Sequence, residues 1–271
     1  MDKIPSYDIE KIHFRNYNDE TGNIILSNFK KYTKLIEFYC YGCDLNELPD
    51  LPNSLKYLDC SNNKLTKLPN LPKSLTNLYC HNNNLSELPH LPTSLIYLNC
   101  SKNNLTRLPK LQNSLKNLIC NNNNLIELPN LSNSLVYLYS EYNNLTELPD
   151  LPNSLEYLGC HYNNLIKLPD LPNSLIHLNC QNNKLTELPD LPNSLTYFFW
   201  VGNNLTYSNF NNKIFNKTNL KNRIIKRMQL LDRTLLLEHS AMITMNPKRI
   251  ERLLDNHEID FFDGSFDTLT H

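Results

Sequence analysis

The chain has 271 residues, and its 26 lysines and arginines against 27 aspartates and glutamates leave a formal net charge of −1. Such a balance gives no overall attraction to nucleic acid or to an acidic membrane surface. No run of about 18 apolar residues occurs, and the start, MDKIPSYDIEKIHF, lacks the apolar segment of a secretory signal. We therefore expect a cytoplasmic protein that spans no membrane and whose eight cysteines are reduced.

Residues 1–34 carry no repeated pattern. Ile9, Ile12 and Phe14 alternate loosely, and residues 18–22 have the composition of a turn. We expect this segment to form a small N-terminal cap, because the apolar end of a stacked repeat structure must be covered.

A repeat of 20 residues follows, and it runs without a slip through residues 35–206 in nine copies. One copy reads LPNSLKYLDCSNNKLTKLPN, and leucine fills the Leu55 and Leu65 columns in all nine. Apolar and polar residues alternate from Tyr57 to Ser61, which predicts a short strand with Leu58 and Cys60 pointing inward. Stacked copies would form a parallel sheet of about nine strands.

The rest of each copy also has predictable roles. The prolines of the return segment LPDLPNS fix φ near −65°, which favours an extended path. Serine recurs in the Ser54 column, where we expect its hydroxyl to bond local backbone at the turn into the strand. The Asn63 column is expected to be buried, with its amide bonded to the backbone of neighbouring turns.

The pattern L-x-x-L-x-C-x-x-N-x-L-x-x-L-P covers about two-thirds of the chain and resembles the leucine-rich repeat. The resemblance implies a solenoid with a curved parallel sheet on its concave side and extended segments on its convex side. The copies L-P-x-L-P-x-S-L-x-x-L resemble the repeats of secreted bacterial effectors. The composition, rich in asparagine, isoleucine and lysine, is similar to that of leucine-rich repeat proteins of giant viruses. Both resemblances imply protein binding in a host cytoplasm.

A column of cysteines recurs at the second inward strand position, and it consists of Cys40, Cys60, Cys80, Cys100, Cys120, Cys160 and Cys180. A zinc site needs about four ligands around one point, and a column spread over many strands does not converge. Parallel neighbours in register have poor geometry for a disulfide. We interpret the column as small apolar packing, with Cys60, Asn63, Leu65 and Trp200 as structural residues. Cys40 and Cys43 form a C-x-x-C pair, but both fall in repeat columns.

The outward strand positions are rich in tyrosine, which provides rigid contact area at low entropic cost and is enriched in interface hot spots. We expect these side chains to point to solvent on the concave face. The residues predicted to bind a partner are Tyr57, Tyr79, His81, Tyr97, Asn99, Tyr137, Tyr139, Glu141, Tyr157, His161, His177, Asn179, Tyr197 and Phe199.

The last repeat and the tail depart from the pattern. Phe198, Phe199 and Trp200 replace smaller residues, and we expect Trp200 to pack against the C-terminal region. Residues 207–271 show helical spacing and are predicted to form a helical cap. Seven basic residues and one acid lie within 213–233, so a basic amphipathic helix that binds a membrane or nucleic acid is the alternative.

No glycine-rich phosphate loop, H-E-x-x-H or G-x-S-x-G motif occurs. We expect no enzymatic activity, no cofactor and no metal. The predicted function is a monomeric protein-interaction module or scaffold. The alternative is a substrate adaptor, in which the basic helical tail docks onto a ubiquitin-ligase or signalling complex.

Overall fold

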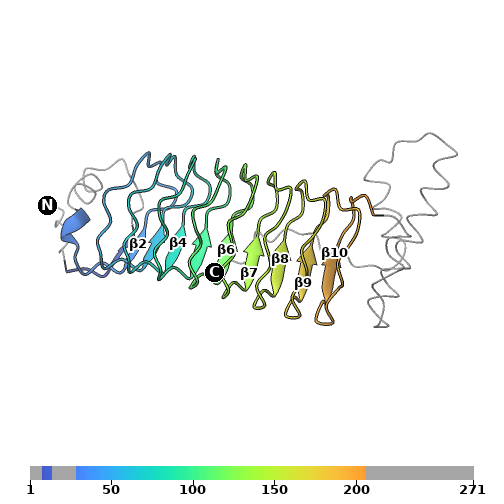
Figure 1. The fold of residues 1–271 in the computed structure, drawn as a ribbon. Coiled ribbons are helices and arrows are strands. Elements are labelled where there is room, and N and C mark those ends of the chain that lie inside the picture. Colours follow the sequence, from blue (N-terminus) through green and yellow to red (C-terminus); the bar gives the residue numbers. More distant parts are fainter. Residues whose placement is uncertain (1–7, 14–28, 206–271) are drawn as a thin grey trace, which may run out of the picture. The chain divides into compact units, whose positions relative to one another are not determined.

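The computed structural model describes residues 8–13 and 29–205 (Figure 1). The described residues form one parallel sheet of ten strands, in which the order in space is the order in sequence. The elements are β1 (Lys11–His13), the 3₁₀ turn η1 (Phe29–Lys31), β2 (Glu37–Tyr39), β3 (Tyr57–Asp59), β4 (Asn77–Tyr79), β5 (Tyr97–Asn99), β6 (Asn117–Ile119), β7 (Tyr137–Tyr139), β8 (Tyr157–Gly159), β9 (His177–Asn179) and β10 (Tyr197–Phe199).

The strands are short because each copy supplies only three residues that alternate between the two sides of the sheet. Leu58 is buried in β3, while Tyr57 and Asp59 on either side are partly exposed. Leu58 pairs with Leu78 of β4, and the same step of 20 residues relates the partners of each strand pair from β2 to β10. A constant register keeps each repeat column in one line along the stack.

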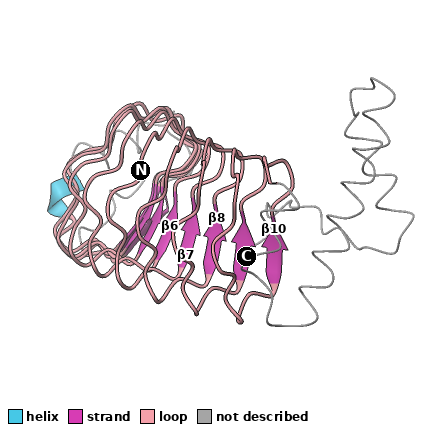
Figure 2. Ribbon diagram, turned by 45° about the vertical axis from the view of Figure 1, so that its right-hand side comes forward, coloured by secondary structure: helices cyan, strands magenta, loops and turns pink. Residues whose placement is uncertain are grey.

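The return segments close each coil without an α-helix anywhere in the described ranges (Figure 2). A tight turn leads into each strand from β3 onward. In the turn before β3, the Leu55 N–H donates to the Pro52 carbonyl at 3.2 Å. No helix in this part of the chain is long and apolar enough to cross a membrane. Twenty residues therefore suffice for one strand and one extended return path.

The serine column links adjacent repeats. We predicted from the sequence that these hydroxyls bond local backbone, and that prediction is wrong for Ser54 and Ser174. Ser54 Oγ donates to the Leu35 carbonyl at 2.7 Å, and Ser174 Oγ donates to the Leu155 carbonyl at 2.6 Å. Each acceptor lies 19 residues earlier, so the hydroxyl ties one turn to the strand entrance of the preceding coil. The partner is a neighbour in space that local sequence does not reveal.

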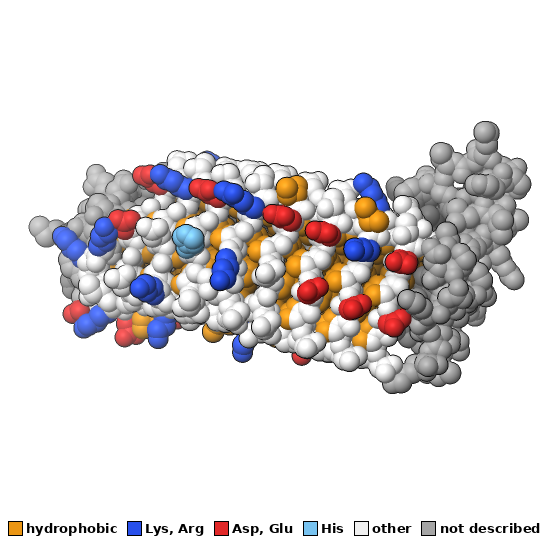
Figure 3. Space-filling view, in the orientation of Figure 1, with side chains coloured by type: hydrophobic (Ala, Val, Ile, Leu, Met, Phe, Trp, Pro, Cys, Tyr) orange, Lys and Arg blue, Asp and Glu red, His pale blue; other side chains and the backbone are white. Residues whose placement is uncertain are grey.

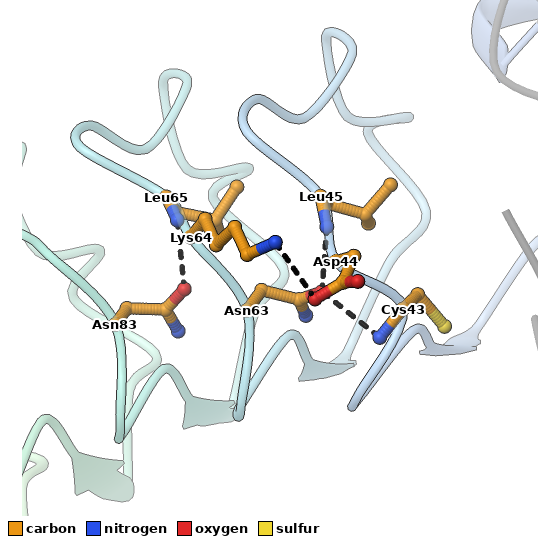
Figure 4. Close-up of polar contacts among 7 residues, drawn as sticks. All are labelled: Cys43, Asp44, Leu45, Asn63, Lys64, Leu65 and Asn83. Atoms are coloured by element: carbon orange, nitrogen blue, oxygen red, sulfur yellow. Dashed lines mark hydrogen bonds and ion pairs between the residues drawn. The ribbon is translucent and has the colours of Figure 1, made fainter.

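The asparagine column forms a second ladder inside the coil (Figure 4). The Oδ1 atom of Asn63 accepts from the N–H groups of Leu45 at 2.9 Å and Cys43 at 3.0 Å. Its Nδ2 donates to the carbonyls of Cys40 at 2.8 Å and Cys60 at 3.0 Å. One amide thus bonds main-chain groups of two repeats, and the Cys60 carbonyl also accepts from Asn83 Nδ2 at 3.0 Å.

The core consists of leucines from successive copies, with the cysteine column between them. Leu55, Leu58 and Leu65 are fully buried. Near the end of the described stack, Phe198 and Trp200 are also buried, and their rings stack with centroids 5.1 Å apart.

The sheet has one strand more than the nine expected from the repeats. Lys11–His13 pairs in parallel with β2, although this segment carries no repeat signature. Of the predicted N-terminal cap, residues 1–7 and 14–28 lie outside the described residues, as does the predicted helical segment 207–271. The cap, the tail and the packing of Trp200 against the tail stay predictions.

Candidate functional site

The cysteine column offers no reactive centre. All eight cysteines are free and buried. Burial raises the pKa of the Cys100 and Cys180 thiols to about 12, so the nucleophilic thiolate is scarce at neutral pH. Within the described ranges, no three histidine, cysteine or acidic side chains are placed to hold a metal ion. The Cys60 thiol donates weakly to the Tyr79 carbonyl of the next repeat at 3.4 Å. Ser140 replaces cysteine in its repeat, and its hydroxyl donates to the Gly159 carbonyl of the next repeat at 3.2 Å.

The outward side chains of the ten strands, together with those two residues beyond each strand from β2 to β10, form a surface that we call the strand face. The predicted binding residues all lie on it, in three columns. The first strand residue is Tyr57, Tyr97, Tyr137, Tyr157, His177 or Tyr197. The third strand residue is Tyr79, Asn99, Tyr139, Asn179 or Phe199. The residue two positions beyond the strand is His81, Glu141 or His161.

The rings on the strand face pack against one another in two runs. The first passes through His13, Tyr39, Tyr57, Tyr79 and Tyr97, with neighbouring centroids 4.4 to 5.2 Å apart. The second passes through Tyr137, Tyr157, His177 and Tyr197, with centroids 4.7 to 5.9 Å apart. Asn117 and Ile119 of β6 separate the two runs.

These contacts leave most of the tyrosines half-buried, whereas the sequence analysis expected them to point freely to solvent. Tyr197 is 55% exposed, but Tyr137, Tyr139 and Tyr157 are intermediate. Burial raises the pKa of Tyr139, and the nearby charge of Glu141 raises it further. Burial likewise lowers the pKa of His177, so this ring is neutral at pH 7. The surface is therefore aromatic and pre-ordered.

Three acidic side chains lie on the strand face, and two of them have partners. Glu37 pairs with Lys11 at 2.8 Å and accepts from the Tyr39 hydroxyl at 3.0 Å. Asp59 accepts from the Ser61 hydroxyl at 2.6 Å. The third, Glu141, has a buried Oε2 atom with no hydrogen-bond partner among residues 8–13 and 29–205.

Sequence reasoning missed two tyrosines beside Glu141. Tyr142 and Tyr162 lie at the turn after β7 and β8, are 46% and 47% exposed, and stack with centroids 4.5 Å apart and planes 12° apart. Both have positive φ, of 53° and 51°. The available signal was the column itself, since the other equivalent positions hold two glycines, four asparagines and one lysine, namely Gly42, Asn62, Asn82, Lys102, Asn122, Asn182 and Gly202.

Formal charge gathers elsewhere on the solenoid. On the side drawn in Figure 3, acidic and basic side chains follow rows along the stack between stripes of apolar atoms. Exposed charges of both signs alternate in one column of the return segments, at Glu47, Lys67, Glu87, Arg107, Glu127, Glu147, Lys167 and Glu187. The strand face from β6 to β10 differs, because Glu141 is the one aspartate, glutamate, lysine or arginine in its three columns.

The architecture is similar to that of several solved structures. YopM, a leucine-rich effector protein from Yersinia pestis, matches with a TM-score of 0.61 and 41% identity over 66% of this chain and 52% of that chain. The chain thus spans about half the length of that YopM chain. The leucine-rich repeat domain of a Shigella effector matches with a TM-score of 0.52 and 30% identity over 69% of this chain and 79% of that domain.

A chain of the Toll–Spätzle complex from Drosophila matches with a TM-score of 0.50 and 25% identity over 66% of this chain and 28% of that one. No family model and no curated protein sequence matches this chain. The repeat columns, the parallel register and the similarity to most of the Shigella domain agree, and the chain belongs to the leucine-rich repeat proteins.

Proposed function

We propose that this protein is a non-enzymatic scaffold that binds a protein partner on its strand face. The observation that carries the proposal is the second aromatic run, Tyr137, Tyr157, His177 and Tyr197, on a surface with a single formal charge. Aromatic side chains held by their neighbours lose little entropy on binding, and large rigid rings dominate interface energetics.

The comparisons support a role in binding. The Toll structure is that of a complex with Spätzle, and YopM and the Shigella protein are described as effectors. By analogy, we propose that this chain acts in the cytoplasm of a host cell, where its buried thiols remain reduced. The resemblance to giant-virus proteins rests on composition and agrees with the same site of action. The adaptor alternative rests on residues 207–271, outside the described residues, and stays a prediction.

The test replaces Tyr137, Tyr139 and Tyr157 together by serine and compares capture of host-lysate proteins by the variant and the wild-type chain. A hot-spot residue loses about 2 kcal/mol or more of binding free energy on truncation. Stacked pairs contribute about 0.5 to 1.5 kcal/mol to stability, so the triple variant is expected to be less stable but still folded. Circular dichroism and thermal melting check the fold before binding is compared.

Two outcomes separate binding from folding. A folded triple variant that loses the partners retained by the wild type supports the strand face as the binding surface. A folded variant that retains all of them removes this face from the mechanism. As a matched control, three exposed return-segment residues, Glu127, Glu147 and Lys167, are replaced by glutamine, and capture is expected to be unchanged.

A further inference from the structure

We propose that Glu141, His161 and the stacked pair Tyr142–Tyr162 form a site for an arginine side chain of the protein partner. This inference deepens the proposed function and rests on it, since it assigns one contact within the strand face. The four residues come from two successive repeats, at and just beyond the carboxyl ends of β7 and β8.

Glu141 supplies the negative charge. A Cβ atom built on Gly159 would lie 3.1 Å from Glu141 Oε2 and 3.3 Å from Tyr139 Cδ1, so both side chains occupy the space that a larger residue in β8 would fill. The carboxylate therefore lies low on the strand face, and its buried Oε2 atom has no hydrogen-bond partner in the part of the chain that the structure describes. An unpaired buried carboxylate oxygen is costly, and a cation that draws it outward would relieve that cost.

The other two acids of this surface show what Glu141 lacks. Glu37 has the Lys11 ammonium and Asp59 has the Ser61 hydroxyl. Among the described residues, no lysine or arginine pairs with Glu141. The strand face from β6 to β10 thus presents one carboxyl group, and a positively charged side chain of a partner is complementary to its ionised form.

Tyr142 and Tyr162 supply the flat aromatic part of the site. Their column turns through the left-handed region, which asparagine and glycine adopt at low cost and tyrosine does not. Non-glycine residues in this conformation are strained, and strained residues concentrate at functional sites. Two adjacent repeats accept this strain and place exposed, stacked rings at the turn, where Tyr142 is close enough to Glu141 for the carboxylate to raise the pKa of the tyrosine.

His161 completes the site as a neutral acceptor. Its ring meets Tyr142 edge-on at 5.3 Å between centroids and Tyr162 at 5.7 Å. Its Nδ1 atom is buried and has no hydrogen-bond partner among the described residues. Burial lowers the pKa of His161 to about 4, so the ring does not repel a cation at pH 7.

Arginine fits this set better than lysine. Its guanidinium is planar and weakly hydrated, stacks on aromatic faces and offers several N–H donors at once, whereas lysine carries a compact and strongly hydrated charge. One side chain could lie against a tyrosine ring while it donates to the Glu141 carboxylate.

The test titrates the full chain with the blocked peptide acetyl-Gly-Ser-Arg-Ser-Gly-amide and follows the ring protons of Tyr142, Tyr162 and His161 by NMR. Two matched peptides carry lysine or citrulline, the neutral isostere of arginine. The arginine peptide is expected to shift these signals and to saturate. Because a charge-assisted hydrogen bond is lost in each case, the citrulline peptide should bind the wild type at least about tenfold more weakly than the arginine peptide does. The arginine peptide should bind the Glu141→Gln variant at least about tenfold more weakly than it binds the wild type. Glu147→Gln, an exposed acid of the same repeat, is expected to bind as the wild type does.

A second variant removes the rings without disturbing the backbone. Tyr142→Asn with Tyr162→Asn restores the residue of the neighbouring repeats, so it should fold at least as well as the wild type. It should bind the arginine peptide about two- to fivefold more weakly for each ring lost. Tyr41→Asn, an exposed tyrosine of the first repeat, is the control and should not change binding.

Two results overturn the inference and leave the proposed scaffold function to its own test. One is full affinity for the arginine peptide in Glu141→Gln. The other is no binding of the arginine peptide to the wild-type chain.

Discussion

At the scale of single residues, the asparagine column shows how one side chain joins two repeats. Asn123 accepts from the Leu105 N–H at 3.0 Å and donates to the carbonyls of Cys100 at 3.1 Å and Cys120 at 3.0 Å. No other residue of similar size offers both an acceptor and two donors in this geometry.

We predict that Asn123→Ala lowers the free energy of unfolding by about 1 to 3 kcal/mol, because it leaves the buried Leu105 N–H without its acceptor and removes one of the two asparagine donors of the Cys100 and Cys120 carbonyls. Asn123→Asp should cost at least as much at pH 7, since a carboxylate oxygen would then face two carbonyl oxygens. Asn124→Asp, at the exposed neighbouring position, should be nearly neutral. Urea denaturation of the three variants checks the order, and equal stabilities for the variants at 123 and 124 would contradict it.

Glu141 predicts a pH dependence of stability. Burial raises the pKa of its carboxyl to about 7, from about 4.5 in a solvated chain. The folded state holds this proton more tightly, so the contribution to stability is complete below pH 4.5 and is lost as the pH rises through 7. The Glu141→Gln variant has no carboxyl to ionise at this position. Its free energy of unfolding should therefore rise relative to that of the wild type by roughly 3 kcal/mol from pH 4.5 to above pH 7, at 1.36 kcal/mol per pKa unit.

Thermal or urea unfolding of both proteins at several pH values measures the difference. Tyr139, Tyr142, Cys120 and Cys160, whose pKa values the Glu141 charge raises, stay protonated throughout. His161 titrates in both proteins, and its contribution cancels in the difference. A difference that stays constant across the range would mean that the carboxyl is solvated in the folded protein.

At the scale of the strand, the cysteine column makes a prediction about reactivity. Thiols with raised pKa values inside a packed core react slowly, because both the thiolate and access to it are scarce. The native protein should therefore react slowly with a thiol reagent, and the unfolded protein should show eight free thiols. Absorbance after reaction with and without denaturant measures this, and rapid reaction of several native thiols would argue against a tightly packed column.

The strands also show what local sequence reveals. The inward positions of Leu58 and Cys60 were predictable, since alternation and a period of 20 leave one consistent register. β1 was not, because Lys11–His13 lacks the repeat and pairs only by its position next to β2. The Ser54 bond and the contact of Glu141 over Gly159 were equally hidden, because each joins residues about 20 positions apart. The tyrosine columns were visible, but their stacking into two runs required the strand spacing and side-chain directions.

At the scale of the whole molecule, equal repeats predict that a complete copy can be removed. Deletion of residues 101–120 joins Cys100 to Asn121 and keeps every column in register, so the chain should fold with somewhat lower stability. Deletion of residues 101–110 shifts the columns by half a repeat and should disrupt the stack. Circular dichroism and thermal melting compare the two, and equal damage from both deletions would show that the repeats are not interchangeable.

The spacing of the strands also sets the period with which a partner segment bound along the second aromatic run can repeat its contacts. Adjacent strands are about 4.7 to 4.9 Å apart, so two repeats advance about 9.6 Å. A polyproline II segment advances 3.1 Å per residue and returns to the same side every third residue, after about 9.3 Å. Side chains three residues apart on such a ligand would meet every second repeat in phase. A partner that runs along the stack would then carry a motif with a period of three, and the arginine that reaches Glu141 would set its phase.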